Sequence, residues 1–380
     1  MSATTRIDRL EWAVLEARRP RRAGSNARLG DHGDVIRLPV LRLTTAGGAS
    51  GFGPCWGGQE QAAALLGRSL EDLFDPAAGV HEAGRLAEFA LWDLAGQVQA
   101  KPVYALAAAA VGRPAPAALS VPCYDTSLYF DDLHLTSTPA AAECIAAEAR
   151  EGLARGHHAF KLKVGRGARH LPLAEGTERD IAVIRAVRAA VGPEAVLMLD
   201  ANNGYNLNLA RHVLDETADC RIYWLEEAFH EDPVLYRLLK DWLAQAGLPA
   251  LIADGEGDAS SHLLEWVHDG LIDVVQYDVA GHGLSAWLRT GRQLDAWGAR
   301  SAPHHYGGLY GNYAACHLAA ALEGFTFAEW DEAASPALDA ADYRIAAGRV
   351  HVPDLPGFGL RLVEAEFQRA LKNGGWELRA

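Results

Sequence analysis

Cysteine is scarce in this chain, and its placement excludes two kinds of small stabilised domain. The 380 residues contain 5 cysteines, an odd number, widely separated at Cys55, Cys123, Cys144, Cys220 and Cys316. No C-x-x-C pair occurs, so neither a disulfide framework nor a structural zinc site is expected. A reducing cytoplasm is the predicted compartment.

Long apolar runs and an excess of basic residues are also missing. No uninterrupted apolar stretch approaches the roughly 20 residues that a membrane-spanning helix needs, so no membrane contact is expected. Arg6, Asp8, Arg9 and Glu11 interrupt the start of the sequence, which argues against a signal peptide. Lys and Arg number 35 against 49 Asp and Glu, a net charge of −14, which opposes nucleic-acid binding.

Length and pattern together predict a small domain followed by a larger one. Within residues 6–60, the β-leaning stretches "RLEWAVLEA" and "VIRLPVLRLTTA" are separated by a predicted polar loop that contains Arg18 to Arg28. A helix is predicted at about 81–100. Prolines and small residues at 105–120 predict a connector, where the small domain ends.

From about residue 119, short apolar runs alternate with longer amphipathic segments, a pattern typical of a parallel α/β sheet. Eight runs are predicted as strands: "SVPCYD", "AFKLKV", "AVLMLD", "RIYWLEE", "ALIADGE", "DVVQYD", "ARSAPHH" and "FTFAEW". With seven helical segments between them they indicate a closed barrel. An open doubly wound sheet is the alternative, but no G-x-G-x-x-G follows the first strand, which disfavours its dinucleotide-binding form.

Seven of the predicted strands end in a residue that can hold a metal or move a proton. They are Lys163, Asp200, Glu226, Glu256, Asp278, His304 and Glu329, one for each strand–helix unit. The carboxyl ends of barrel strands converge on one face. We therefore expect these side chains to share one pocket.

Three carboxylates in succession predict a metal site. Asp200, Glu226 and Glu256 follow the runs "VLMLD", "IYWLE" and "LIADGE". One such carboxylate often only caps a helix, but three in one crevice require a cation. Hard oxygen ligands favour Mg²⁺, with Mn²⁺ as the alternative. Asp254 and Glu227 are the alternative ligands if the register differs by one or two residues.

The stretch "FKLKV" places Lys161 and Lys163 on the same face of a strand. An isolated K-x-K usually marks a solvated face or edge. Beside a metal site, however, each ammonium disfavours protonation of the other, which would lower the pKa of a lysine toward that of a general base. The neighbouring strands favour this catalytic interpretation.

Asp278 and His304 end consecutive strands, so Asp278 is predicted to bind one imidazole nitrogen and turn the other toward the pocket. This would be a second acid/base group. The alternative is a core histidine satisfied by a buried aspartate. His305 is expected to point to the opposite face, because side chains alternate along a strand.

Taken together, these segments resemble the enolase superfamily, in the mandelate racemase and muconate lactonizing enzyme group and its mandelate racemase-like acid-sugar dehydratases. The resemblance covers nearly the whole chain. It is carried by "EFALWDLAGQVQAKPVYAL", "FKLKVG", "LMLDANNGY", "WLEEA", "IADGE", "VVQYD", "APHHYG" and "VPDLPGFGL".

The resemblance implies a (β/α)₇β TIM-like barrel at 119–345. An α+β capping domain would be built from residues 1–118 and from a C-terminal segment, 346–380, that returns to it. It also implies Mg²⁺ on the three carboxylates, Lys163 as base with Lys161 assisting, and His304 with Asp278 as the opposing acid/base. Asn202 would contact the substrate, and a protonated Glu329 would donate a hydrogen bond to it. A homo-oligomer is a further expectation.

The chemistry implied is removal of the proton next to a carboxylate through an enediolate intermediate. Dehydration of an acid sugar to a 2-keto-3-deoxy product is the predicted reaction, with a small-molecule carboxylate as the partner. Arg22, in the arginine-rich loop, is predicted to bind this substrate; the alternative is a solvated surface charge. A racemase or epimerase of a hydroxy or amino acid, and a barrel hydrolase with zinc on "PHH", are the other functions considered.

Overall fold

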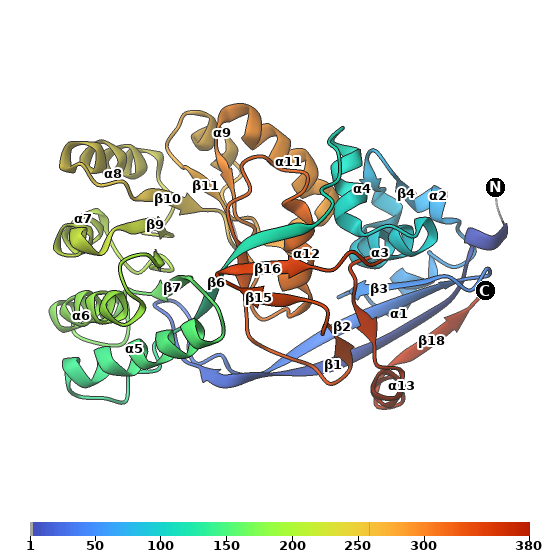
Figure 1. Ribbon diagram of the computed structural model, residues 1–380, viewed down its shortest axis with the longest axis horizontal. Helices are drawn as coiled ribbons and strands as arrows, with labels where there is room; N and C mark the ends of the chain where they lie inside the picture. The colour runs from blue at the N-terminus through green and yellow to red at the C-terminus, as the bar shows by residue number, and fades with distance from the viewer. Residues whose placement is uncertain (1–2, 258) are drawn as a thin grey trace.

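Both ends of the chain meet in one antiparallel sheet (Figure 1). The computed structural model describes residues 3–257 and 259–380. The strand order in this sheet is β18 (Trp376–Arg379), β1 (Ile7–Ala23), β2 (Gly33–Thr45) and β3 (Ser50–Pro54). Helix α3 (Glu88–Gln99) lies directly on β3, because a Cβ on Gly51 would come 2.3 Å from the backbone nitrogen of Leu94.

Arg18, Arg19, Arg21 and Arg22 lie in a strand rather than in a loop, which corrects the prediction, whereas Arg28 lies in the connecting loop. β1 continues to Ala23, and Arg18 pairs in register with Val35 of β2. Buried and exposed residues alternate along most of β1, as in a sheet with one face on a core. Only residues 24–32 connect β1 to β2.

Eight parallel strands form the second part of the structure, and each overlaps one of the predicted runs. They are β6 (Leu119–Leu128), β7 (Ala159–Lys163), β8 (Val196–Asp200), β9 (Ile222–Glu226), β10 (Leu251–Asp254), β11 (Val274–Val275), β12 (Arg300–Ser301) and β13 (Ala328–Trp330). Neighbours pair from β6 through to β12, and β13 pairs with β6. Ser301 of β12 also bridges Phe325, three residues before β13, so the pairing returns to β6.

A helix follows each of the first seven parallel strands (Figure 1). These helices are α5 (Thr138–Ala154), α6 (Leu173–Val191), α7 (Leu207–Glu216), α8 (Pro233–Ala246), α9 (Leu263–His268), α11 (Leu284–Trp297, preceded by the short α10, Val279–His282) and α12 (Tyr310–Leu318). The chain is therefore an α/β protein, as predicted. Within the described residues, no helix has the length and apolar character needed to cross a membrane.

The remaining elements refine two predictions. The helix expected at about 81–100 is a 3-10 turn, Glu82–Ala87, followed by α3. The expected connector at 105–120 is in part a helix, α4 (Val103–Ala110).

The other elements are 3-10 turns at Ala3–Thr5, Arg166–Ala168 and Ala218–Cys220, α1 (Gln59–Ala63), α2 (Leu70–Leu73), β4 (Phe74–Asp75), β5 (Gly79–Val80), β14 (Leu338–Asp339), β15 (Arg344–Ala346), β16 (Arg349–Val352), β17 (Arg361–Leu362) and α13 (Glu364–Lys372).

The C-terminal part of the chain connects the two sheets. β16 pairs antiparallel with β6, and β15 pairs with β16, so residues 344–352 extend the sheet of parallel strands. The chain then passes through α13 to β18, which pairs with β1 (Figure 1).

Candidate active site

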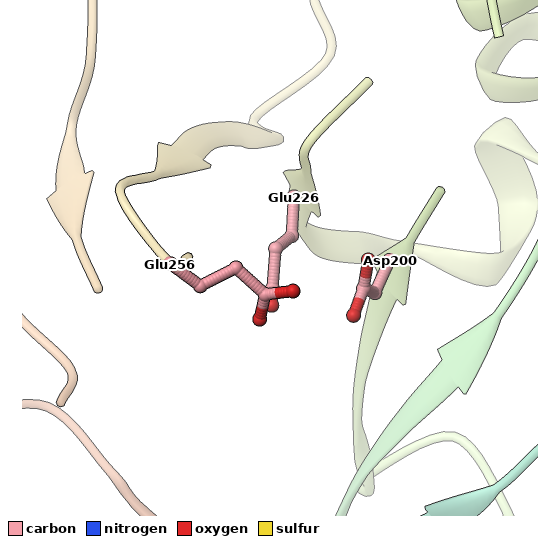
Figure 2. Close-up of side chains that lie close together, drawn as sticks. All are labelled: Asp200, Glu226 and Glu256. Carbon is pink, nitrogen blue, oxygen red and sulfur yellow. The ribbon is translucent and has the colours of Figure 1, made fainter. Parts of the chain in front are cut away.

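Three carboxylates meet beyond the ends of adjacent strands. Asp200 is the last residue of β8, Glu226 the last of β9, and Glu256 lies two residues after β10. Each offers an oxygen, and these oxygens all lie within 4.8 Å of one another. Figure 2 shows the three side chains turned toward a common point. We refer to Asp200, Glu226 and Glu256 as the carboxylate triad.

The carboxylate triad has the chemistry of a divalent-cation site. Asp200 and Glu226 are both 0% exposed. Burial, and then the charge of Asp200, raise the pKa of Glu226 well above its usual value, so further positive charge would favour its ionised form. Buried carboxylate oxygens in excess of nearby cations suit Mg²⁺ or Mn²⁺. No other cluster of this kind occurs within 3–257 and 259–380.

The two alternative ligands have other partners. Asp254 accepts a hydrogen bond of 2.6 Å from the hydroxyl of Tyr236. Glu227 accepts hydrogen bonds from the side-chain amides of Asn202 and Asn203. The register that places Asp200, Glu226 and Glu256 together is therefore the one that the structure adopts.

Both lysines of the K-x-K strand reach the carboxylate triad. Lys163 pairs in register with Asp200, so the two side chains leave neighbouring strands at the same level and form an ion pair. Nζ of Lys161 lies 2.7 Å from Oε1 of Glu226 and 3.0 Å from Oε1 of Glu329. The predicted orientation of the two lysines toward a shared pocket is thus observed.

The lysine pKa values differ from the prediction. Burial alone would lower them, but Glu226 and Glu329 raise the pKa of Lys161, and Asp200 raises that of Lys163. Lys161 does lower the pKa of Lys163, as expected, yet the carboxylates outweigh it. The prediction considered only the two ammonium groups. A divalent cation bound to the same carboxylates would oppose their effect.

Asp278 and His304 form the predicted dyad. Nδ1 of His304 lies 3.0 Å from Oδ2 of Asp278, and its Nε2 lies 3.1 Å from Oε2 of Glu256. Burial would lower the pKa of His304, but Glu256, Glu329 and Asp278 raise it to about 10. His304 therefore stands at the Glu256 end of the carboxylate triad, whereas Lys163 stands at the Asp200 end.

Glu329 is an acceptor, which corrects the prediction of a protonated donor. Its carboxylate accepts hydrogen bonds of 2.6 Å from the hydroxyl of Thr126 and from the backbone N–H of His305. Burial would raise its pKa, but Lys161 and His304 lower it below the usual value. Glu329 thus holds Lys161 in place rather than offering a proton. His305 is buried as well.

Asn202 and Arg22 were both predicted to contact the substrate, and they lie in different surroundings. Nδ2 of Asn202 donates to Glu227 and Glu256, and its Oδ1 is buried with no hydrogen-bond partner among the described residues. Asn202 therefore borders the carboxylate triad. The side chain of Arg22 is 69% exposed and pairs with Asp31, which favours the alternative of a solvated surface charge. The continuous strand β1 turns Arg22 toward solvent.

Several residues around the site were missed by sequence reasoning. Oε2 of Glu226 accepts hydrogen bonds from Trp224 (3.1 Å) and Gln276 (2.8 Å). Alternation along β9 puts Trp224 on the same face as Glu226, so this signal was present in the sequence. Tyr129, whose ring centroid lies 5.2 Å from Nζ of Lys163, and His32 carry no comparable pattern.

The geometry matches a known family. A family model described as "Enolase C-terminal domain-like" matches residues 144–366. The chain belongs to this family. The match includes every residue of the carboxylate triad, both lysines and the dyad, and it confirms the resemblance to the enolase superfamily and its mandelate racemase and muconate lactonizing enzyme group.

Solved structures of family members extend the similarity to the whole chain. Galacturonate dehydratase from Geobacillus sp., complexed with D-galacturonate and 5-keto-4-deoxy-D-galacturonate, is 46% identical with a TM-score of 0.94, over 99% of this chain and 100% of that one. A mandelate racemase/muconate lactonizing protein from Geobacillus sp. Y412MC10, complexed with magnesium and tartrate, is 46% identical with a TM-score of 0.96, over 100% and 98%.

A more distant relative has another activity. The D-galactarolactone cycloisomerase of Agrobacterium fabrum is 31% identical over 231 residues. That match spans 57% of this chain and 57% of the length of the curated relative. The family thus contains both dehydratases and isomerases.

Proposed function

We propose that this protein is a Mg²⁺-dependent lyase that dehydrates an acid sugar, with a hexuronate such as D-galacturonate as the leading substrate. The observation that carries the proposal is the placement of two acid/base groups, Lys163 and His304, at opposite ends of one carboxylate triad. The full-length similarity to the Geobacillus galacturonate dehydratase supports the choice of substrate.

The proposal includes a fold assignment. The ring of parallel strands would be a (β/α)₇β barrel at 119–345, covered by an α+β cap made from residues 1–118 and 346–380. The pairing of β18 with β1 and the bridge from Ser301 to Phe325 support this assignment. Active sites of such barrels lie at the carboxyl ends of the strands, where the carboxylate triad is found.

The carboxylate triad would hold Mg²⁺, with Mn²⁺ as the alternative. A cation there would stabilise the negative charge that develops on the substrate carboxylate during proton removal. Asn202, whose Oδ1 lacks a partner among the described residues, is proposed to contact the substrate. Lys161, held by Glu329 at 3.0 Å, would donate to a carboxylate oxygen of the substrate.

The reaction then needs one base and one acid on opposite faces of the substrate. Lys163 takes the proton from the carbon next to the carboxylate, which produces the enediolate. His304 gives its Nε2 proton to the hydroxyl on the following carbon, and that hydroxyl leaves as water. Asp278 holds the ring through Nδ1. The enol product rearranges to a keto acid with no change in oxidation state overall.

The product follows from this bond breaking. The keto group forms next to the carboxylate and the neighbouring carbon loses its hydroxyl. In an aldonic acid the carbon numbering starts at the carboxylate, so the product is a 2-keto-3-deoxy acid. In a hexuronate the numbering starts at the other end, so the corresponding product is a 5-keto-4-deoxy acid, the kind of molecule bound to the Geobacillus enzyme.

The test is a substrate screen with Mg²⁺ present. D-Galacturonate and a panel of aldonic and aldaric acids would be incubated with the protein, and keto acid formation would be followed. Lys163→Ala and His304→Ala should each lower turnover by at least about 100-fold, the range for loss of a general acid or base. Normal turnover by either variant would contradict the role assignments.

Racemisation or epimerisation is the second candidate, because two groups on opposite faces of a carbon also suit this reaction. Incubation in D₂O separates the two functions. Dehydration yields a keto acid, whereas racemisation places deuterium on the α-carbon of the inverted acid. The zinc hydrolase has less support, since the two ring nitrogens of His304 lie 3.0 Å from Asp278 and 3.1 Å from Glu256.

Two further properties belong to the proposal. The five cysteines have no disulfide partner among the described residues, which fits a reducing cytoplasm. A homo-oligomer is proposed from the resemblance to the family.

A further inference from the structure

We infer that His32 binds a hydroxyl group at the end of the substrate farthest from its carboxylate, an inference that rests on the proposed acid-sugar dehydration. His32 lies at the end of the loop between β1 and β2. Its Nε2 is buried and has no hydrogen-bond partner among the described residues. Because an unmet buried polar atom is costly, a partner from outside the chain is expected there.

Aromatic rings connect His32 to the catalytic groups. The Tyr129 ring centroid lies 5.2 Å from Nζ of Lys163 and 5.0 Å from the His32 ring. Tyr306, two residues after His304, stacks on Tyr129 at 5.0 Å and meets His32 edge-on at 5.3 Å. The three rings form a wall from Lys163 to the His304 segment. A sugar with its α-carbon between Lys163 and His304 would extend along this wall to His32.

The loop that carries His32 is anchored to the parallel-strand part of the structure. The carbonyl of Ser25 accepts a hydrogen bond of 2.9 Å from the backbone N–H of Phe130. The carbonyl of Arg28 accepts one of 2.7 Å from the guanidinium of Arg169. The loop that carries His32 is therefore held against the segments that follow β6 and β7, and a specific hydrogen bond requires such a fixed position.

The charge around His32 favours a neutral sugar end over a second carboxylate. The guanidinium of Arg19 lies 4.6 Å from the Tyr306 ring centroid, but its Nε and Nη2 both bind Asp331, at 3.1 and 2.8 Å. Burial, then Lys163 and Arg19, lower the pKa of His32 to about 4, so its ring is neutral at pH 7. A neutral imidazole suits a hydroxyl, which can both donate and accept.

Three substitutions at His32 test the inference. His32→Phe keeps a ring for the edge-on contacts and removes the nitrogens. His32→Gln can place an amide nitrogen near the position of Nε2, whereas His32→Asn can replace only Nδ1. For D-galacturonate, kcat/KM should fall about tenfold in the Phe and Asn variants, as expected for one lost buried hydrogen bond, and less in the Gln variant. The loss should fall mainly on KM.

A short acid provides the matched control. Glycerate has the carboxylate and the two neighbouring hydroxyls but nothing beyond them, so its inhibition constant should change less than twofold in His32→Phe. Equal losses for both molecules, or no loss for D-galacturonate in folded His32→Phe and His32→Asn, would overturn the hydroxyl subsite alone. Absence of turnover by the wild-type protein with any acid sugar would overturn the proposed function, and the subsite with it.

Discussion

His304 places Nδ1 3.0 Å from Oδ2 of Asp278, and this contact determines which ring nitrogen faces the carboxylate triad. The other oxygen of Asp278, Oδ1, accepts a hydrogen bond of 2.8 Å from the backbone N–H of Gly281 at the start of α10. The carboxylate is thus held by a helix as well as by the histidine. Nε2 is left 3.1 Å from Glu256, ready to act on a substrate.

Asp278→Asn should weaken the acid role of His304. The carboxylate contributes to raising the pKa of His304 to about 10, so its neutralisation should lower that pKa. An acid with a lower pKa loses its proton at lower pH. The alkaline limb of the kcat profile should therefore shift to lower pH, and kcat should fall at least about tenfold. Rate profiles over pH check this. Asp269→Asn, on an exposed residue, is the control and should leave the profile unchanged.

Loss of a triad carboxylate should strongly weaken Mg²⁺ binding. We expect Asp200→Asn and Glu256→Gln to bind Mg²⁺ at least about 100-fold more weakly by titration calorimetry, because each removes a charged ligand. Asp254→Asn is the matched control. Asp254 is a neighbouring buried carboxylate that binds Tyr236 instead, so its substitution should leave the affinity nearly unchanged. Similar losses in all three variants would contradict the ligand assignment.

Mg²⁺ should also stabilise the folded protein. A ligand that binds only the folded state adds about 2.7 kcal/mol to the free energy of unfolding at 100 times its dissociation constant. Thermal unfolding with and without EDTA measures this effect. The Glu256→Gln protein should show no dependence on Mg²⁺, whereas the Asp254→Asn protein should keep it.

Trp224→Phe should lower Mg²⁺ affinity without removing a ligand. The indole N–H donates to Oε2 of Glu226 at 3.1 Å and thereby orients the carboxylate. Loss of such a supporting contact typically costs about 10- to 100-fold in metal affinity. Calorimetry measures the affinity, and Mg²⁺ in excess should restore most of kcat. An unchanged affinity would show that Gln276 alone orients Glu226.

Alternation along strands explains why the polar cluster could be predicted. Lys161, Lys163, Asp200 and Glu226 face one side because successive side chains alternate, and the carboxyl ends of parallel strands converge. The sequence therefore identified the triad, the lysine pair and the dyad. Their catalytic roles remain predictions.

The errors come from charges and partners that only the folded chain reveals. The pKa of Lys163 is raised because Asp200 contacts it, a contact that no sequence spacing measures. Glu329 was predicted to be protonated. Its carboxylate instead accepts a hydrogen bond from Thr126, on the first parallel strand, and forms an ion pair with Lys161. Arg22 was placed in a loop, whereas β1 continues through it. His32 reaches the site only through the packing of the two parts of the structure.

His157 forms a partly buried ion pair with Glu332, apart from the carboxylate triad. His157, which is 0% exposed, places Nε2 2.5 Å from Oε1 of Glu332, and Nε of Arg155 lies 3.3 Å from the same oxygen. Burial would lower the pKa of His157, but contacts with Cys123 and Glu332 raise it to about 10. The histidine is therefore charged at neutral pH.

His157 should make stability depend on pH above neutrality. Its pKa is raised on folding, so its contribution is fully present below about 6.5, the unfolded value, and is lost as pH rises through about 10. The contribution is on the order of a few kcal/mol. Urea unfolding of the wild type and of His157→Gln, from pH 6 to 10.5, measures it, because other titrating groups cancel in the difference. The difference should shrink with rising pH; a constant difference would mean that His157 is neutral in the folded protein.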